Sequence, residues 1–136
     1  MKKRWKLLFG IPIGVIIVFG AGLLSWFAFA PIQEPIGGAV DSGRLHNGVF
    51  EGEYRDGPNR AHVAVTIEDG RIVDIDVRRN VASWIGKKAD PAVPERILAQ
   101  QSTQVDAVTG ATHSSNVIMN AVEQAIRKSY AAGDGR

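Results

Sequence analysis

The chain contains no cysteine among its 136 residues. This absence excludes a disulfide framework, thiolate catalysis, a thioether-linked haem and a cysteine-ligated metal cluster. A strong charge of either sign is also lacking, because 16 Lys and Arg oppose 14 Asp and Glu. Much of the basic excess belongs to the N-terminus, so the rest of the chain is close to neutral. We therefore expect no nucleic-acid partner.

Charged residues are missing altogether from residues 7–29. As a helix this segment would be about 34 Å long, enough to cross the hydrocarbon core of a bilayer. The preceding MKKRWK is basic and should stay in the cytoplasm. Residues 1–30 are therefore predicted to form a cytoplasmic stub and a single-pass anchor in the cell membrane, with the remainder extracytoplasmic. A cleaved signal peptide is the alternative, but the long apolar run and Pro31 count against it.

Proline and glycine concentrate after the apolar segment, in PIQEPIGGAVDSG. This stretch has no hydrophobic periodicity, so residues 31–46 are predicted to form a flexible linker. The folded domain is expected over residues 47–130, and a disordered tail over 131–136. Roughly 90 residues are sufficient for a single core.

Three segments have the alternating pattern of strands: residues 48–55 (GVFEGEYR), 61–68 (AHVAVTIE) and 71–79 (RIVDIDVRR). Asp69-Gly70 predicts a two-residue hairpin turn. In the third segment Val73, Ile75 and Val77 are expected to face the core. Together the segments predict an antiparallel meander with one wet face.

Two helices are expected after the strands. Pro91 and Pro94 mark the entrance of a short helix over residues 95–100. Apolar residues then recur at helical spacing through residues 115–130, which predicts a long helix. Its expected core positions are Ile118, Ala121, Val122, Ala125 and Ile126. The predicted fold class is α+β: a transmembrane helix followed by a small antiparallel sheet packed against one long and one short helix.

The stretch VDAVTGATHSS, residues 105–115, places four hydroxyl side chains around a Gly-Ala pair at the entrance of the long helix. One interpretation is structural: Ser114 or Ser115 caps the helix and the other hydroxyls are solvated. The other uses the helix N-terminus as a phosphate site, with Thr112 beside it. The sequence shows no base arranged to activate the Thr112 hydroxyl, so covalent attachment of a phosphate there would need another protein.

Three stretches resemble FMN-binding domains, which are related to the covalently flavinylated subunits of the Rnf and sodium-pumping NADH:quinone oxidoreductase complexes. They are GVFEGEY (48–54), VAVTIEDGRIVDIDV (63–77) and QSTQVDAVTGATHSS (101–115). The resemblance implies that Thr112 carries FMN through a phosphoester bond. It also implies that a separate, metal-dependent flavin transferase attaches the flavin from FAD outside the cytoplasm.

The resemblance gives roles to the rest of the motif. Gly110 and Ala111 leave room for the transferase and the flavin. Thr109 and Ser115 are expected to donate hydrogen bonds to phosphate oxygens. Asp106 is expected to belong to the element that the transferase recognises, with a turn-stabilising role as the alternative.

Four further residues are candidates for contacts with the flavin. Trp84 would stack on the isoalloxazine ring, or else cap the sheet. Lys87, with Lys88, would stabilise reduced, anionic flavin, or else simply be solvated. His113 would tune the flavin or carry protons, since histidine changes charge near neutral pH, or else be solvated. No metal is expected, because His46 and His62 lack the spacing of a metal site.

These observations predict a membrane-anchored, extracytoplasmic electron carrier rather than an independent enzyme, with no catalytic residues of its own. Its partners would be the flavin transferase, a membrane quinone reductase or other electron donor, and an exported flavin or haem protein as acceptor. One alternative is a regulatory or sensor domain that binds FMN non-covalently. Another is a flavin-free, membrane-anchored interaction module. A nucleotide-binding module is disfavoured because the P-loop lysine and spacing are missing.

Overall fold

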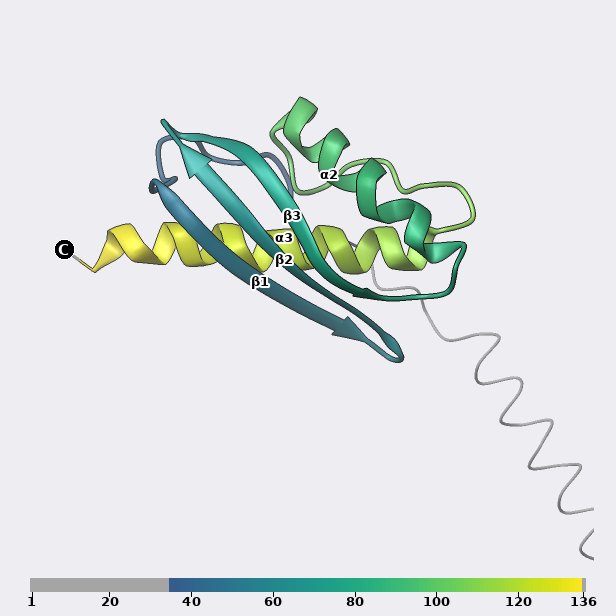
Figure 1. The fold of residues 1–136 in the computed structure, drawn as a ribbon. Helices are drawn as coiled ribbons and strands as arrows, with labels where there is room; N and C mark the ends of the chain where they lie inside the picture. Colours follow the sequence, from purple (N-terminus) through teal and green to yellow (C-terminus); the bar gives the residue numbers. More distant parts are fainter. Residues whose placement is uncertain (1–34, 136) are drawn as a thin grey trace, which may run out of the picture. The chain divides into compact units, whose positions relative to one another are not determined.

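The computed structural model describes residues 35–135, which form a three-stranded sheet packed against helices (Figure 1). This confirms the α+β prediction for that part of the chain. The predicted stub and anchor, residues 1–30, lie outside the described residues. Within the described range, no helix has both the length and the apolar character that crossing a membrane requires. The elements in order are β1 (Gly48–Asp56), β2 (Asn59–Glu68), β3 (Arg71–Val81), η1 (Gly86–Lys88), α2 (Ala89–Gln100) and α3 (Thr112–Asp134).

The sheet is an antiparallel meander in the order β1-β2-β3. Asp69 and Gly70, between β2 and β3, have φ angles of 49° and 73°. Positive φ at both central residues is the requirement of a type I′ hairpin turn, whose twist matches that of the strands. The predicted Asp69-Gly70 turn is therefore confirmed.

A β-bulge in β3 changes which residues face the core. Thr66 pairs with Asp74 but Ile67 pairs with Ile72, so Val73 is an extra residue opposite β2. Ile72 is buried, whereas Val73 is 45% exposed. The prediction that Val73 faces the core is therefore wrong, because strict alternation assumes one residue opposite each partner. Ile75, past the bulge, is buried as expected.

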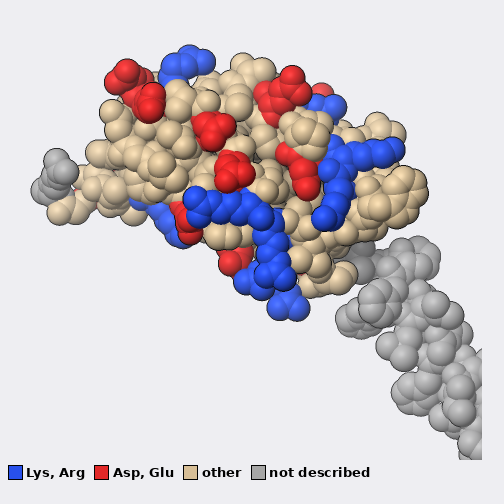
Figure 2. Space-filling view, viewed as in Figure 1, with Lys and Arg blue, Asp and Glu red and all other residues tan. Residues whose placement is uncertain are grey.

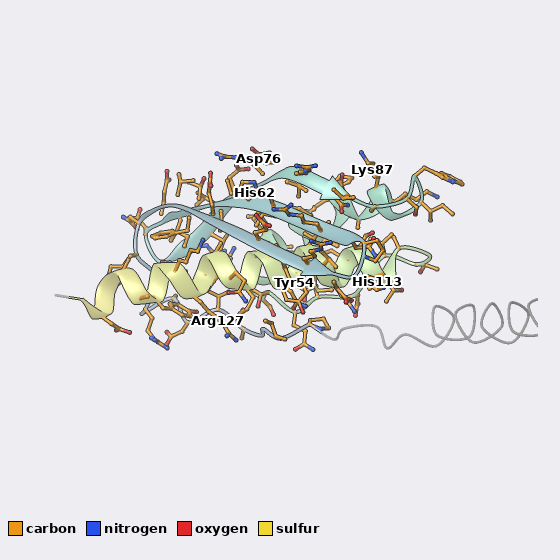
Figure 3. All side chains as sticks on the ribbon, turned by 90° about the horizontal axis from the view of Figure 1, so that it is seen from below. Tyr54, His62, Asp76, Lys87, His113 and Arg127 are labelled. Atoms are coloured by element: carbon orange, nitrogen blue, oxygen red, sulfur yellow. The ribbon has the colours of Figure 1, made fainter. Side chains whose placement is uncertain are left out.

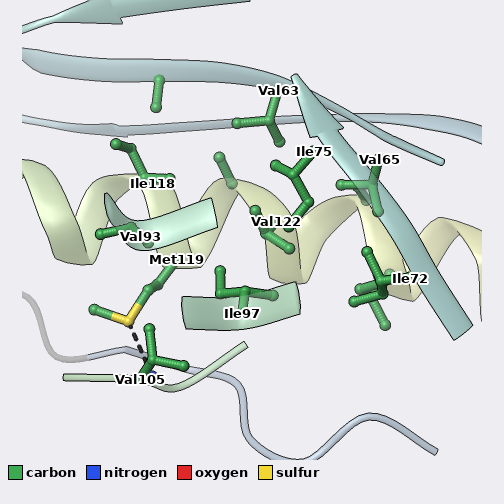
Figure 4. Close-up of a cluster of buried hydrophobic side chains, with 14 of the residues drawn as sticks. Val63, Val65, Ile72, Ile75, Val93, Ile97, Val105, Ile118, Met119 and Val122 are labelled. Carbon is green, nitrogen blue, oxygen red and sulfur yellow. Dashed lines mark hydrogen bonds between the residues drawn. The ribbon is translucent and has the colours of Figure 1, made fainter. Parts of the chain in front are cut away.

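Helix α3 lies across the inner face of the sheet, and α2 lies beside it (Figure 1). A methyl group on Gly52 would overlap the carbonyl oxygen of Ala121, so this glycine lets the backbone of β1 approach α3 closely. All five predicted core residues of the long helix are buried, and Figure 4 shows Ile118 and Val122 among apolar side chains from the sheet and α2. These five are Ile118, Ala121, Val122, Ala125 and Ile126.

Helix α2 is twice as long as predicted and begins at Ala89. Pro91 lies in its first turn, where the missing N–H would have no helical partner. Pro94 lies inside the helix and is buried against the core, so its packing offsets a lost backbone hydrogen bond. The predicted start of this helix near residue 95 is therefore wrong, because it assumes that both prolines precede the helix.

Residues 35–46 were predicted as part of a flexible linker, but they are hydrogen-bonded to the domain. The Ile36 amide donates to Asn120 Oδ1 at 2.8 Å, and the Val40 amide donates to the Gln101 carbonyl at 3.0 Å. Leu45 is buried in the core. The ordered unit therefore begins before Asn47, and we call residues 35–46 the N-terminal strap. At the other end, α3 continues through Asp134, so residues 131–134 of the predicted tail are helical.

Candidate functional site

The hydroxyl-rich motif forms the loop that leads into α3. Gly110 has a φ angle of 79°, a conformation that favours glycine, and it turns the chain into the helix. Thr112 is the first residue of α3 and its side chain is exposed. The N-cap position is Ala111, and no side chain caps this end of the helix. The prediction that Ser114 or Ser115 is the N-cap is therefore wrong, because the N-cap lies three to four residues earlier.

Ser115 holds the motif loop from inside. It is fully buried, its hydroxyl donates to the Ala111 carbonyl at 2.8 Å, and its oxygen accepts from the Val108 amide at 3.0 Å. The hydroxyl therefore acts as both donor and acceptor within the protein. The expectation that Ser115 donates to a phosphate is therefore wrong, whereas Thr109 and Thr112 remain exposed on the outer side of the loop.

Further contacts fix the loop from behind. Arg96 on α2 donates from Nη1 to the Asp106 carbonyl at 2.5 Å, while the Asp106 side chain is exposed. The Val105 amide lies 3.3 Å from the Met119 sulfur, the contact drawn as a dashed line in Figure 4. The inner side of the loop is thus held by α2 and α3, and the Asp106 side chain lies on its exposed side.

A cavity of about 450 Å³ opens beside the start of α3. This volume lies within the range of about 300–1,000 Å³ typical of small-molecule sites. Residues from the β1–β2 turn, the end of β3, η1 and the motif line it: Pro58, Asn59, Val81, Ala82, Ser83, Gly86, Gly110, Ala111, His113 and Ser114. Ala111 and His113, the two neighbours of Thr112, are both among them.

The cavity and the helix end together fit a flavin phosphate. The first amides of a helix carry a partial positive charge and attract anions, and here no side chain covers them. Ser114 is 4% exposed and lines the cavity. Among residues 35–135, its hydroxyl has no hydrogen-bond partner. The arrangement therefore offers a phosphate position outside the loop and a partly polar pocket next to it.

His113 contacts an acidic residue that the sequence did not single out. Its Nε2 lies 2.8 Å from Asp56 Oδ2, at the end of β1, and both atoms are enclosed. The two atoms are within ion-pair distance, but the carboxylate oxygen lies off the direction of the ring N–H. His113 is therefore paired rather than simply solvated. Asp56 preceded a Gly-Pro turn in the sequence, so nothing distinguished it from an ordinary turn aspartate.

Trp84 does not cap the sheet, since it is 77% exposed. The Nζ atom of Lys88 lies 5.9 Å from its ring centroid, and Lys87 is also exposed. Lys87 and His113 lie toward the same end of the domain (Figure 3). Gly86 precedes Lys87 and packs closely on α3. A side chain on Gly86 would overlap the Ser114 hydroxyl. Trp84, Lys87 and Lys88 thus border the site without filling it.

The two other histidines described are not at the site. His46 Nδ1 lies 3.1 Å from the Arg44 carbonyl, and His62 pairs with Glu51 on the open face of the sheet. Across residues 35–135, no group of three His, Asp or Glu side chains is placed to hold a metal ion. The candidate site therefore consists of the cavity and the motif loop.

Comparison with known proteins agrees with this geometry. No curated protein matches the chain. The FMN-binding domain family matches residues 58–127, which is more than half of the chain. The matched region runs from the β1–β2 turn to near the end of α3 and includes every residue that lines the cavity. The chain therefore belongs to the FMN-binding domain family and is a flavin-binding protein.

Proposed function

We propose that the protein is a membrane-anchored extracytoplasmic flavoprotein that carries FMN covalently on Thr112 and transfers electrons between redox partners. The observation that carries this proposal is the contrast between Thr112 and Ser115 in one helical turn. The Thr112 side chain is exposed between two cavity-lining residues, whereas the Ser115 hydroxyl is buried with its donor and acceptor both used.

The residues around Thr112 suit a phosphoester. The uncapped amides of α3 and the positive end of its dipole stabilise the phosphate charge. Gly110 is exposed and has no side chain, so a flavin and an attaching enzyme can approach the loop. The isoalloxazine ring would occupy the cavity lined by His113 and Ser114. When bound, the flavin supplies the redox chemistry, and the protein orients it.

The attachment itself needs a second protein. A threonine hydroxyl is a weak nucleophile without a neighbouring base. The nearest histidine, His113, is paired with Asp56 rather than with Thr112. A separate flavin transferase would supply the base and the metal ion, and the exposed Asp106 carboxylate is available for its recognition.

The sequence supports the proposed anchor, and the partners are proposed from the side of the membrane that it implies. The uncharged segment 7–29 and the basic residues before it support a single-pass anchor with the flavin domain outside the cytoplasm. Outside the cytoplasm, FMN that is not covalently bound would diffuse away from the domain. A covalent link prevents this loss. The electron donor would be a membrane quinone reductase or another reductase, and the acceptor an exported flavin or haem protein.

The second candidate is a domain that holds FMN non-covalently and acts as a sensor, since the cavity alone would accept the ring. Intact mass and in-gel flavin fluorescence after SDS denaturation distinguish the two, on protein coexpressed with an exported flavin transferase. One FMN adduct in the peptide of residues 105–115 supports the covalent carrier. Colour that is lost on denaturation supports the sensor. Colourless protein, with the transferase active on a control substrate, supports a flavin-free interaction module.

A further inference from the structure

Charged side chains on the open face of the sheet neutralise one another. Glu51 on β1 pairs with Arg78 on β3 and with His62 on β2. Arg60 and Glu53 form another pair across β1 and β2. In the face seen in Figure 2, Lys and Arg likewise lie next to Asp and Glu. A surface built of such pairs presents little net charge to a partner.

The segment from Arg79 to Lys88 (RNVASWIGKK) differs from that face. It contains three cations and no acidic residue. Arg79, Lys87 and Lys88 are all exposed, and none has an ion-pair partner within the described range of the chain. The segment also supplies four residues of the cavity wall. Three cations without an ion pair therefore lie in a ten-residue segment that forms part of the cavity wall.

Apolar side chains are exposed in the same segment. Residues 35–135 expose six large apolar side chains, and three of them, Val81, Trp84 and Ile85, lie within five consecutive positions. Ile85 also reaches the motif loop, since a side chain on Gly110 would lie 3.7 Å from its Cγ2. Exposed apolar groups rimmed by charge are typical of interaction sites. We call Val81, Trp84, Ile85, Lys87 and Lys88 the docking patch.

We infer that the docking patch binds an electron-transfer protein whose own docking surface is acidic. This inference rests on the proposed function. Weak redox complexes bury less than about 1,200 Å² and depend on complementary charge for rapid encounter. The two lysines provide that charge, and the exposed Trp84 ring offers a large apolar contact beside them. The patch adjoins the cavity, so a partner docked there sits next to the flavin.

The redox step is an ordinary exchange with one-electron acceptors. Each reduced flavin gives one electron to each of two acceptor proteins and releases its protons to solvent. The probe for an acidic acceptor is plastocyanin, a copper protein in which Cu(II) is reduced to Cu(I). The probe for a basic acceptor is cytochrome c, in which Fe(III) haem is reduced to Fe(II).

The test uses the full chain in detergent, with the flavin content first established by mass and absorbance. The flavin is reduced with dithionite, excess reductant is removed, and oxidation by each probe is followed in a stopped-flow instrument. Against plastocyanin at low ionic strength, K87E/K88E should lower the second-order rate constant by about tenfold or more. Against cytochrome c the same variant should raise it. Both differences should shrink near 1 M salt, where the Debye length is about 3 Å.

The matched control is R71E/K128E, which changes the net charge equally at exposed positions outside the segment. It should alter either rate constant much less than K87E/K88E does. Equal effects of the two variants, or no dependence on the charge of the probe, would overturn the docking patch. Protein that never acquires flavin would instead overturn the proposed function, and the mass measurement shows this before any oxidation is measured.

Two other uses of the patch give different results. If it docks the flavin transferase, K87E/K88E slows flavin attachment and leaves oxidation unchanged. If it contacts lipid, the variant fails to bind vesicles containing phosphatidylglycerol and again oxidises normally. Trp84→Ala sharpens the test: a slower reaction with plastocyanin at an unchanged midpoint potential supports docking. A shifted potential with both probes slowed alike assigns Trp84 to the flavin site and overturns its place in the patch.

Discussion

Ser115 and Ser129 are two fully buried serines on α3 that make the same kind of contact at opposite ends of the helix. Each hydroxyl accepts a hydrogen bond from a backbone amide outside the helix and donates one to a carbonyl. Ser115 binds the Val108 amide and the Ala111 carbonyl, at 3.0 and 2.8 Å. Ser129 binds the amide and the carbonyl of His46, at 2.8 and 3.2 Å.

The difference lies in what each serine holds. Ser129 helps to fasten the N-terminal strap over the C-terminal half of α3, and Tyr130 adds a hydrogen bond from the Asp41 amide to its hydroxyl. Ser115 holds the motif loop from behind and leaves its outer side exposed. One half of the helix is therefore covered by the chain itself, and the other end is open to a ligand. Four substitutions test this comparison.

The largest effect is expected from Thr112→Ala. It should abolish the FMN adduct completely, because it removes the proposed acceptor oxygen. The free energy of unfolding should change by less than about 0.5 kcal/mol, since Thr112 is exposed and does not cap the helix. Intact mass and urea denaturation measure the two quantities. Thr109→Ala is the matched control and should keep the adduct; a normal adduct on the Thr112→Ala protein would remove Thr112 from the site.

Ser115→Ala should affect both folding and attachment. It leaves the Val108 amide without its acceptor, which should lower the free energy of unfolding by about 1–3 kcal/mol. The loosened loop should also take up flavin more slowly, although Thr112 remains. A time course of adduct formation with purified transferase measures the rate. An unchanged rate would show that the loop does not need this support.

Ser129→Ala is the counterpart at the covered end. It removes two partly buried hydrogen bonds to His46 in the strap, whereas one of the two bonds that Ser115 makes, to the Ala111 carbonyl, is buried. The loss of stability should therefore be smaller than for Ser115→Ala, about 1 kcal/mol. The rate of flavin attachment should match that of the unmodified protein. If Ser129→Ala and Ser115→Ala slowed attachment equally, the two ends of α3 would not be functionally distinct.

Asp56→Asn should change the bound flavin only slightly, and its effect on stability should also be small. The pair with His113 is partly exposed, and such pairs contribute less than about 1 kcal/mol. Because His113 lines the cavity, its release should still shift the visible absorption maximum of the bound flavin. Glu51→Gln, which removes the partner of His62 on the open face, is the control and should leave the spectrum unchanged. Identical spectra for both variants would separate the His113 pair from the flavin.

The parts of the fold that depend on local chemistry were predictable from the sequence. Asp69-Gly70 fits only a few turn types, and the apolar period of α3 identified its buried face. The bulge at Val73 was not predictable, because pairing across strands decides it. The N-terminal strap was not predictable either: its glycines and proline are typical of a linker, and its order comes from partners more than sixty residues away, such as Thr103.

The site was predictable to a similar extent. The motif drew attention to Gly110 and the approach loop, and Gly110 does line the cavity, since hydroxyls and small residues before a helix have a chemical meaning. Thr112 as the acceptor of FMN stays a prediction. Residues brought in from other elements carried no such signal. Asp56 resembled a turn residue, and Gly86 mattered only because η1 packs against α3. Ser115 was misassigned because a hydroxyl near a helix start can face outward or inward, and only packing decides which.

The N-terminal strap also sets how far the flavin domain can move from its proposed anchor. A linker over residues 31–46 would span up to about 55 Å when extended, whereas residues 31–34 alone would span at most about 14 Å. Binding of residues 35–46 to the domain therefore shortens the maximum reach of the linker by roughly three quarters. If the proposed anchor holds the chain in a membrane, this short connection would keep the cofactor close to the membrane surface and raise its effective concentration toward membrane-bound reductases. Acceptor proteins in the bulk phase gain no such increase in effective concentration. Their encounter with the flavin domain would therefore depend on complementary charge.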